Sequence, residues 1–142
     1  MTRITLDQAN TIIAAAFARG VELGLKPLSV VVLDPGGHPI AFQRQDGGSS
    51  LRYAIATAKA GGALALGVSS RTIGEMAVER PTFIAALGPI APTGVVPAAG
   101  GVIVRDGASA ASTGSMRIAR ASAARIRARS TRPWLPGGGS RS

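Results

Sequence analysis

The sequence predicts a single α/β domain of the α+β class, because stretches with helical spacing and stretches with strand chemistry both occur in residues 1–106. Apolar side chains recur at helical spacing over residues 5–24. Two β-branched runs, SVVVLD and PIAFQR, flank Pro35-Gly36-Gly37, a turn typical of an antiparallel hairpin. A chain of 142 residues has room for one such domain with a substantial core.

The first helix is expected to begin at Thr5, because Thr5 and Gln8 have the spacing of a capping box. A glycine, either Gly20 or Gly24, is expected to end it.

The hairpin is predicted to join strands over residues 28–34 and 38–45. Successive side chains of a strand alternate between faces. One face of the second strand is therefore expected to carry the only histidine together with two apolar residues and a cation: His38, Ile40, Phe42 and Arg44.

The second predicted helix spans residues 51–67 and follows Ser49 and Ser50, which can cap its first turn. Its two glycines each cost roughly 1 kcal/mol against alanine, so close packing has to compensate. We expect its small residues to lie against a sheet or against the same helix of a second copy, which predicts a homo-oligomer. These residues are Ala54, Ala58, Gly61, Gly62 and Ala65.

Shorter elements complete the predicted fold. Ser69 or Ser70 is expected to cap a third helix, and Pro81 to occupy the first position of a fourth. Residues 101–105 are predicted to form a strand of the same sheet. Asp106-Gly107 is a strong hairpin pattern, but no partner strand is expected after it, because the following residues lack period-2 alternation.

The net charge of +9 is divided unevenly along the chain. Residues 1–106 carry +2, whereas residues 107–142 hold seven arginines and no acid. A body near neutrality is unlike a basic DNA-binding fold, so nucleic acid is not expected as a partner of the domain. We therefore expect a domain over residues 1–106 and a tail over residues 107–142 rich in Arg, Ser and Ala.

Two interpretations of the tail remain open. It is either a disordered arm that binds an anionic partner through phosphate charge, or a non-native ending that arises from out-of-frame translation. The abrupt change in composition after residue 107 favours the second interpretation. The coding DNA, read in all three frames, would separate the two.

Composition excludes several kinds of chemistry. The absence of cysteine rules out disulfides, thiolate nucleophiles and cysteine metal ligands. No apolar run is long enough to span a bilayer and the start has no secretory pattern, so a cytoplasmic location is expected. One histidine and scattered carboxylates do not make a metal centre unless subunits share it.

Three motifs together resemble the HbpS/GlcG family of haem-associated proteins, which includes the C-terminal domain of PduO. The first is the hairpin pattern met by Asp34, Gly36, Gly37, His38, Ile40, Phe42, Arg44, Asp46 and Gly47. The others are the pair Lys59-Ala60 in a small-residue helix and Gly100-Gly101 before a strand. The resemblance covers about residues 4–107.

The resemblance implies an antiparallel sheet flanked by helices, assembled into a homo-oligomer. Family members continue after the position of Asp106-Gly107 with a last strand and a final helix, and both are expected to be missing here. The resemblance also implies haem as the cofactor, with haem binding, haem degradation or redox sensing as the function.

His38 is the candidate iron ligand, because a neutral imidazole is a sufficient axial ligand for haem. Ile40 and Phe42 are expected to cover the porphyrin, and Arg44 and Lys59 to pair with its propionates. With Asp46 beside them, the predicted cofactor-binding residues are His38, Arg44, Asp46 and Lys59, gathered in one pocket that a neighbouring subunit completes.

Other roles for His38 remain open. A histidine after a glycine turn often only begins a strand. No nucleophile–acid partners stand at a recognisable spacing, so whether the protein is an enzyme is left undecided. The alternative function is a small-molecule lyase or isomerase, or a metabolite-binding protein, with His38 as acid or base beside Asp34 or Asp46. A Soret band on titration with haem would separate the two classes.

Overall fold

The computed structural model of the chain describes residues 4–106 and 109–115. Its helices are α1 (Leu6–Glu22), α2 (Arg52–Leu66), α3 (Ser70–Glu79) and α4 (Pro81–Leu87). Its strands are β1 (Ser29–Leu33), β2 (Pro39–Arg44), β3 (Gly101–Asp106) and β4 (Ser109–Ser115).

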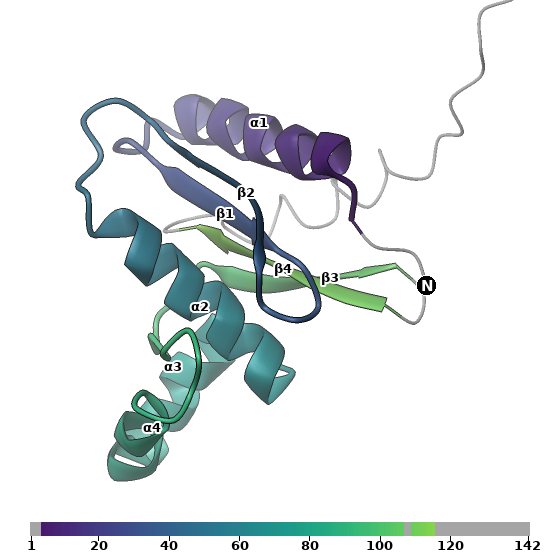
Figure 1. Ribbon diagram of the computed structural model, residues 1–142. Helices are drawn as coiled ribbons and strands as arrows, with labels where there is room; N and C mark the ends of the chain where they lie inside the picture. Colours follow the sequence, from purple (N-terminus) through teal and green to yellow (C-terminus); the bar gives the residue numbers. More distant parts are fainter. Residues whose placement is uncertain (1–3, 107–108, 116–142) are drawn as a thin grey trace, which may run out of the picture.

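The described residues form three layers (Figure 1). A four-stranded antiparallel sheet of order β2-β1-β4-β3 lies in the middle, with α1 on one face and α2 on the other. α3 packs beside α2, and α4 packs against α3 at the end away from the sheet. The α/β class with an antiparallel sheet flanked by helices is confirmed. No helix in this part of the chain is long and apolar enough to cross a membrane.

Local signals set the ends of α1 as expected. The Thr5 hydroxyl accepts a hydrogen bond from the Gln8 backbone N–H at 3.2 Å, and the Gln8 side chain accepts one from the Thr5 N–H at 2.9 Å. Gly24 follows the last turn with φ +62°, a conformation that favours glycine. The helix therefore begins and ends where the sequence predicts.

β1 is buried on both faces, which explains its unbroken apolar run. Val30 and Val32 pack against α1, whereas Val31 and Leu33 pack against α2. Burial of each such side chain is worth roughly 1.5–3 kcal/mol. β1 is thus the strand that ties the two helical layers together.

The hairpin of β1 and β2 is confirmed, but the predicted faces of β2 are wrong. The register slips between Val32 and Leu33, which pair with Ala41 and Pro39. This bulge leaves Ile40 without a partner and ends the alternation. Ile40 packs with Ala41 on the α1 side, and Phe42 packs on the α2 side. Ile40 and Phe42 therefore cannot form one porphyrin-covering face.

The expectation that the last strand is missing is also wrong. β4 pairs with β3 on one side and with β1 on the other, so it is an interior strand (Figure 1). Its run of Ser, Ala, Thr and Gly has weak strand propensity, and hydrogen bonds from two neighbouring strands override that preference. The sheet continues to Ser115, past the boundary predicted at residue 106. The final helix would fall on residues 116–142, outside the described residues.

The outer side of α2 is covered by the crossing loop, residues 88–100, which joins α4 to β3. A Cβ at Gly61 would overlap the Thr93 side chain, and one at Gly62 would lie 3.6 Å from Val95. The close packing predicted for the two glycines is therefore present, but the partner is the chain itself. This part of the small-residue face is not available to a second copy.

The start of α2 differs from the serine cap that was expected. Its N-cap is Leu51, which makes no side-chain capping hydrogen bond. Ser69 does cap α3, accepting from the Thr72 N–H at 3.2 Å, and Pro81 is the first residue of α4.

Candidate functional site

The turn between β1 and β2 is built by one carboxylate. Asp34 Oδ1 accepts hydrogen bonds from the backbone N–H of Gly36 at 2.8 Å and of His38 at 2.9 Å. The Asp34 N–H donates to the His38 carbonyl at 2.8 Å, and Gly37 takes φ +84°. These bonds place His38 at the end of the turn, directly before β2.

The imidazole of His38 projects from this turn, and its side chain is 80% exposed. Its Nδ1 lies 3.4 Å from Asp34 Oδ1. The His38 backbone N–H lowers the pKa of Asp34 most, and burial opposes it. The Gly36 N–H and the imidazole add to the lowering, so the pKa lies below its ordinary value. The aspartate is therefore an anion at neutral pH, beside an accessible ring.

A small cavity lies beside the turn, and it has a volume of ≈ 160 Å³. It separates the turn from α2 and the crossing loop, and its lining residues are Pro35, Gly36, Gly37, Gly61, Leu64, Ala65, Pro92 and Thr93. Ligand pockets usually measure about 300–1,000 Å³, so this cavity is too small to enclose a porphyrin.

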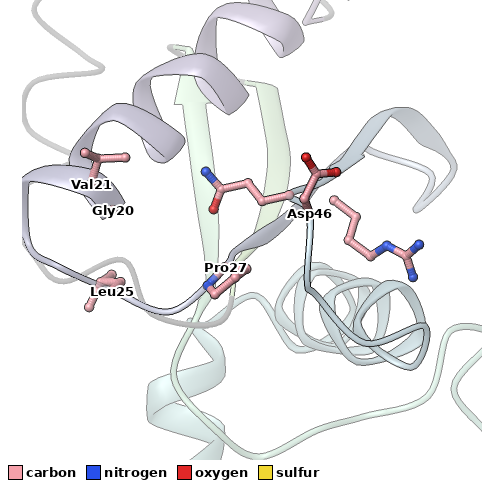
Figure 2. Close-up of a pocket in the computed structure, with 7 residues that line it drawn as sticks. Gly20, Val21, Leu25, Pro27 and Asp46 are labelled. Atoms are coloured by element: carbon pink, nitrogen blue, oxygen red, sulfur yellow. The ribbon is translucent and has the colours of Figure 1, made fainter.

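Arg44 and Asp46 line a different hollow, an open groove of ≈ 520 Å³. In Figure 2, Gly20, Val21 and Leu25 stand on one side of this groove and Asp46 on the other. His38 and Lys59 are not among its lining residues.

His38 and Arg44 stand at opposite ends of β2. Six residue steps at a strand rise of 3.3 Å separate them by roughly 20 Å. The structure therefore brings Arg44 and Asp46 together, but it does not gather the four predicted residues into one pocket of a single chain.

Lys59 lies inside the protein, with 4% of its surface exposed. Its ammonium group donates to the Ala99 carbonyl at 3.0 Å. Burial lowers the pKa of Lys59, and the positive charge of Arg52 acts in the same direction. A contact with a propionate would require Lys59 to leave this carbonyl, so its part in cofactor binding stays a prediction.

Ser70 is a buried neighbour that sequence reasoning treated only as a possible cap. Its hydroxyl donates to the Ala98 carbonyl at 2.7 Å and accepts from the Gly101 N–H at 2.7 Å. Lys59 of α2 and Ser70 of α3 together hold the end of the crossing loop against these two helices. No local pattern indicates this, because the partners are 28 to 40 residues apart.

The described residues contain no group of three or more His, Asp or Glu side chains that could hold a metal ion. The imidazole of His38 is an exposed nitrogen donor.

Comparisons with known proteins agree with this fold. A family model described as "Haem degrading protein HbpS-like" matches residues 4–130. A crystal structure of a double mutant of Streptomyces reticuli HbpS is 27% identical, with a TM-score of 0.70, and covers 90% of this chain and 85% of that chain. A second HbpS crystal structure is 26% identical, with a TM-score of 0.71 and coverage of 94% and 93%.

A more distant structure, a complex of PduOC with haem, has a TM-score of 0.68 over 88% of this chain and 90% of that chain. At 19% identity, this likeness concerns the fold alone. No curated protein sequence matches the chain significantly.

Proposed function

The chain belongs to the HbpS-like family of haem-associated proteins, and on this premise we propose that it binds haem through Nε2 of His38. The observation that carries the proposal is an imidazole that is 80% exposed and lies beside a carboxylate on a hydrogen-bonded turn. A neutral imidazole with a carboxylate at its other nitrogen is a common form of iron ligand.

The donor atoms of the chain fit haem, although its cavities do not enclose it. Haem supplies the iron to which Nε2 binds, and the solved PduOC complex has a similar fold with haem bound. The cavity beside His38 is too small for a porphyrin. We therefore propose that the haem lies at the surface of one chain and is covered by a second copy.

A shared site also gives Arg44 and Asp46 a role. They stand at the far end of β2, roughly 20 Å from the His38 of the same chain. In the proposed homo-oligomer, the propionate partner of a haem on His38 is Arg44 of the other copy. Haem degradation and redox sensing would both begin from this bound state.

The direct test is a spectrophotometric titration with ferric haem. The wild-type chain should develop a Soret band, and His38→Ala should abolish it or shift it strongly. Glu22→Gln is a matched control, because Glu22 is an exposed residue of α1 paired with Arg19 at 2.7 Å. A wild-type spectrum in the His38 variant would show that iron has another ligand.

A complementation experiment tests whether the site is shared. Arg44→Ala should weaken haem binding by about 1.5–3 kcal/mol, the value of a hydrogen bond to a charged group. Co-expressed His38→Ala and Arg44→Ala chains should recover part of the affinity, because a mixed pair contains one intact site. No recovery, together with a monomer in sedimentation, would confine the site to one chain.

The Asp34–His38 pair also favours a second candidate, a small-molecule lyase or isomerase in which His38 is the acid or base. A carboxylate beside an imidazole is a frequent arrangement in such sites. This candidate predicts no Soret band at stoichiometric haem, and a loss of turnover in His38→Ala with a carboxylate-bearing substrate.

A further inference from the structure

The carboxylate of Asp34 faces the imidazole of His38 in addition to binding the backbone of the turn. Its Oδ1 accepts from the N–H groups of Gly36 and His38, and the same oxygen lies 3.4 Å from Nδ1 of the imidazole. That last distance is at the long end of the range for an N–H···O contact. One anionic oxygen thus faces one ring nitrogen.

Gly36 fixes the place of the ring from the other side. A Cβ at this position would lie 3.0 Å from Nδ1, 3.1 Å from Cε1 and 3.3 Å from Asp34 Oδ1. The imidazole therefore occupies the space that a side chain would take. The ring is held between a carboxylate and a bare Cα although most of its surface is exposed.

From this geometry we infer that Asp34 is a positioning residue, which keeps the imidazole proton on Nδ1 and directs the lone pair of Nε2 to solvent. A carboxylate oxygen accepts a proton and cannot donate one, so it stabilises the tautomer that carries hydrogen on the facing nitrogen. The consequence for haem rests on the proposed function, but the tautomer is a property of the free protein.

The inference explains why an exposed imidazole would be an effective ligand. A free histidine has to select one tautomer and one orientation before Nε2 can bind. Here the turn makes both choices in advance. Partners that orient a ligating histidine in this way typically change metal affinity by about 10–100-fold.

The test uses nuclear magnetic resonance of the full chain labelled with ¹⁵N and ¹³C histidine, without haem. The chain contains one histidine, so its ring signals need no assignment. At a pH where the ring is neutral, the Nδ1–H tautomer should dominate in the wild type. A dominant Nε2–H tautomer would overturn the inference.

Two variants separate positioning from folding. Asp34→Asn keeps an oxygen for the two backbone N–H groups but removes the charge, and should lower the ratio of Nδ1–H to Nε2–H about fivefold, because charged acceptors are roughly twice as strong as neutral ones. Asp34→Ser can still support the turn, but its hydroxyl is too short to reach the ring. It should shift the ratio further. Glu22→Gln, an equal loss of charge on α1, should leave the ratio unchanged.

A titration with ferric haem then tests the proposed function separately from the role of Asp34. In Asp34→Asn the affinity for haem should fall about 10-fold or more while the Soret band persists. A wild type with the Nδ1–H tautomer but no Soret band would overturn haem binding and leave Asp34 as the positioning residue. An unchanged tautomer ratio in Asp34→Asn would overturn the role of Asp34, whatever haem does.

Discussion

Two glycine pairs, Gly36-Gly37 and Gly100-Gly101, lie at the starts of strands of the same sheet. The imidazole beside the first pair is exposed, and the polar side chains beside the second pair are buried. The first pair leaves an imidazole 80% exposed at the tip of a hairpin. The second pair leads into β3 beneath a lysine that is 4% exposed and a serine that is fully buried.

The glycines are needed for different reasons. Gly37 takes φ +84° to close a tight turn, and Gly36 leaves the space in which the exposed imidazole lies. Gly101 makes room for the backbone carbonyl of Lys59, which cannot move without the helix. The exposed pair thus belongs to the proposed binding site, whereas the buried pair serves packing.

The largest change in stability is expected when a glycine of the buried pair is replaced by alanine. Gly101→Ala places a Cβ against the Lys59 carbonyl and 3.0 Å from the Ser70 hydroxyl. It should lower the free energy of unfolding by about 3 kcal/mol. Gly36→Ala meets the exposed imidazole and, at 3.3 Å, the Asp34 carboxylate, which are side chains that can shift, and should cost about 1 kcal/mol. Urea denaturation measures both, and equal losses would contradict the contrast.

The next effect concerns two adjacent serines at the start of α3. Ser70→Ala leaves the Ala98 carbonyl and the Gly101 N–H without a partner, and should cost about 2 kcal/mol. Ser69→Ala removes only the helix cap and should cost about 1 kcal/mol. Thermal unfolding of both variants checks the order. A greater loss at Ser69 would mean that the capping bond outweighs the buried bridge.

A smaller effect should appear in the pH dependence of stability. The pKa of Lys59 is lowered in the folded protein, so near and below 10.5 the unfolded chain binds more protons at this residue than the folded chain does. Stability due to Lys59 should therefore rise as pH increases from the folded pKa towards 10.5. The difference in unfolding free energy between wild type and Lys59→Met should show this slope. A difference independent of pH would show that Lys59 titrates normally.

The smallest effect is expected at the exposed pair. His38→Ala should change the free energy of unfolding by about 0.5 kcal/mol or less, because its side chain is mostly in water. Loss of haem binding without loss of stability would mark His38 as a binding residue. A large loss of stability would instead give the imidazole a structural role.

Features that depend on a few neighbouring residues were predictable from the sequence. The capping box of Thr5 and Gln8, the hairpin turn and the start of α4 at Pro81 all involve partners within four residues. The resemblance to the haem-associated family also rested on short motifs, and the family match confirms it.

The errors came from contacts between distant residues. Two ladder neighbours form β4 although its composition is weakly strand-like. One bulge near Ile40 moved Phe42 to the opposite face. Neither the pairing of β4 with two distant strands nor the slip of register in β2 can be recognised from the sequence of the strand alone.

By itself, the sequence determined the class of fold, the ends of most helices and the position of His38 after a glycine turn, because short-range hydrogen bonds and backbone preferences decide these. Only the tertiary structure decided that Lys59 is buried against Ala99 and that Phe42 lies on the opposite face of β2 from Ile40. The first depends on a contact between residues that are 40 positions apart. The second depends on the way β2 pairs with β1. Packing at that range is not encoded in any local pattern.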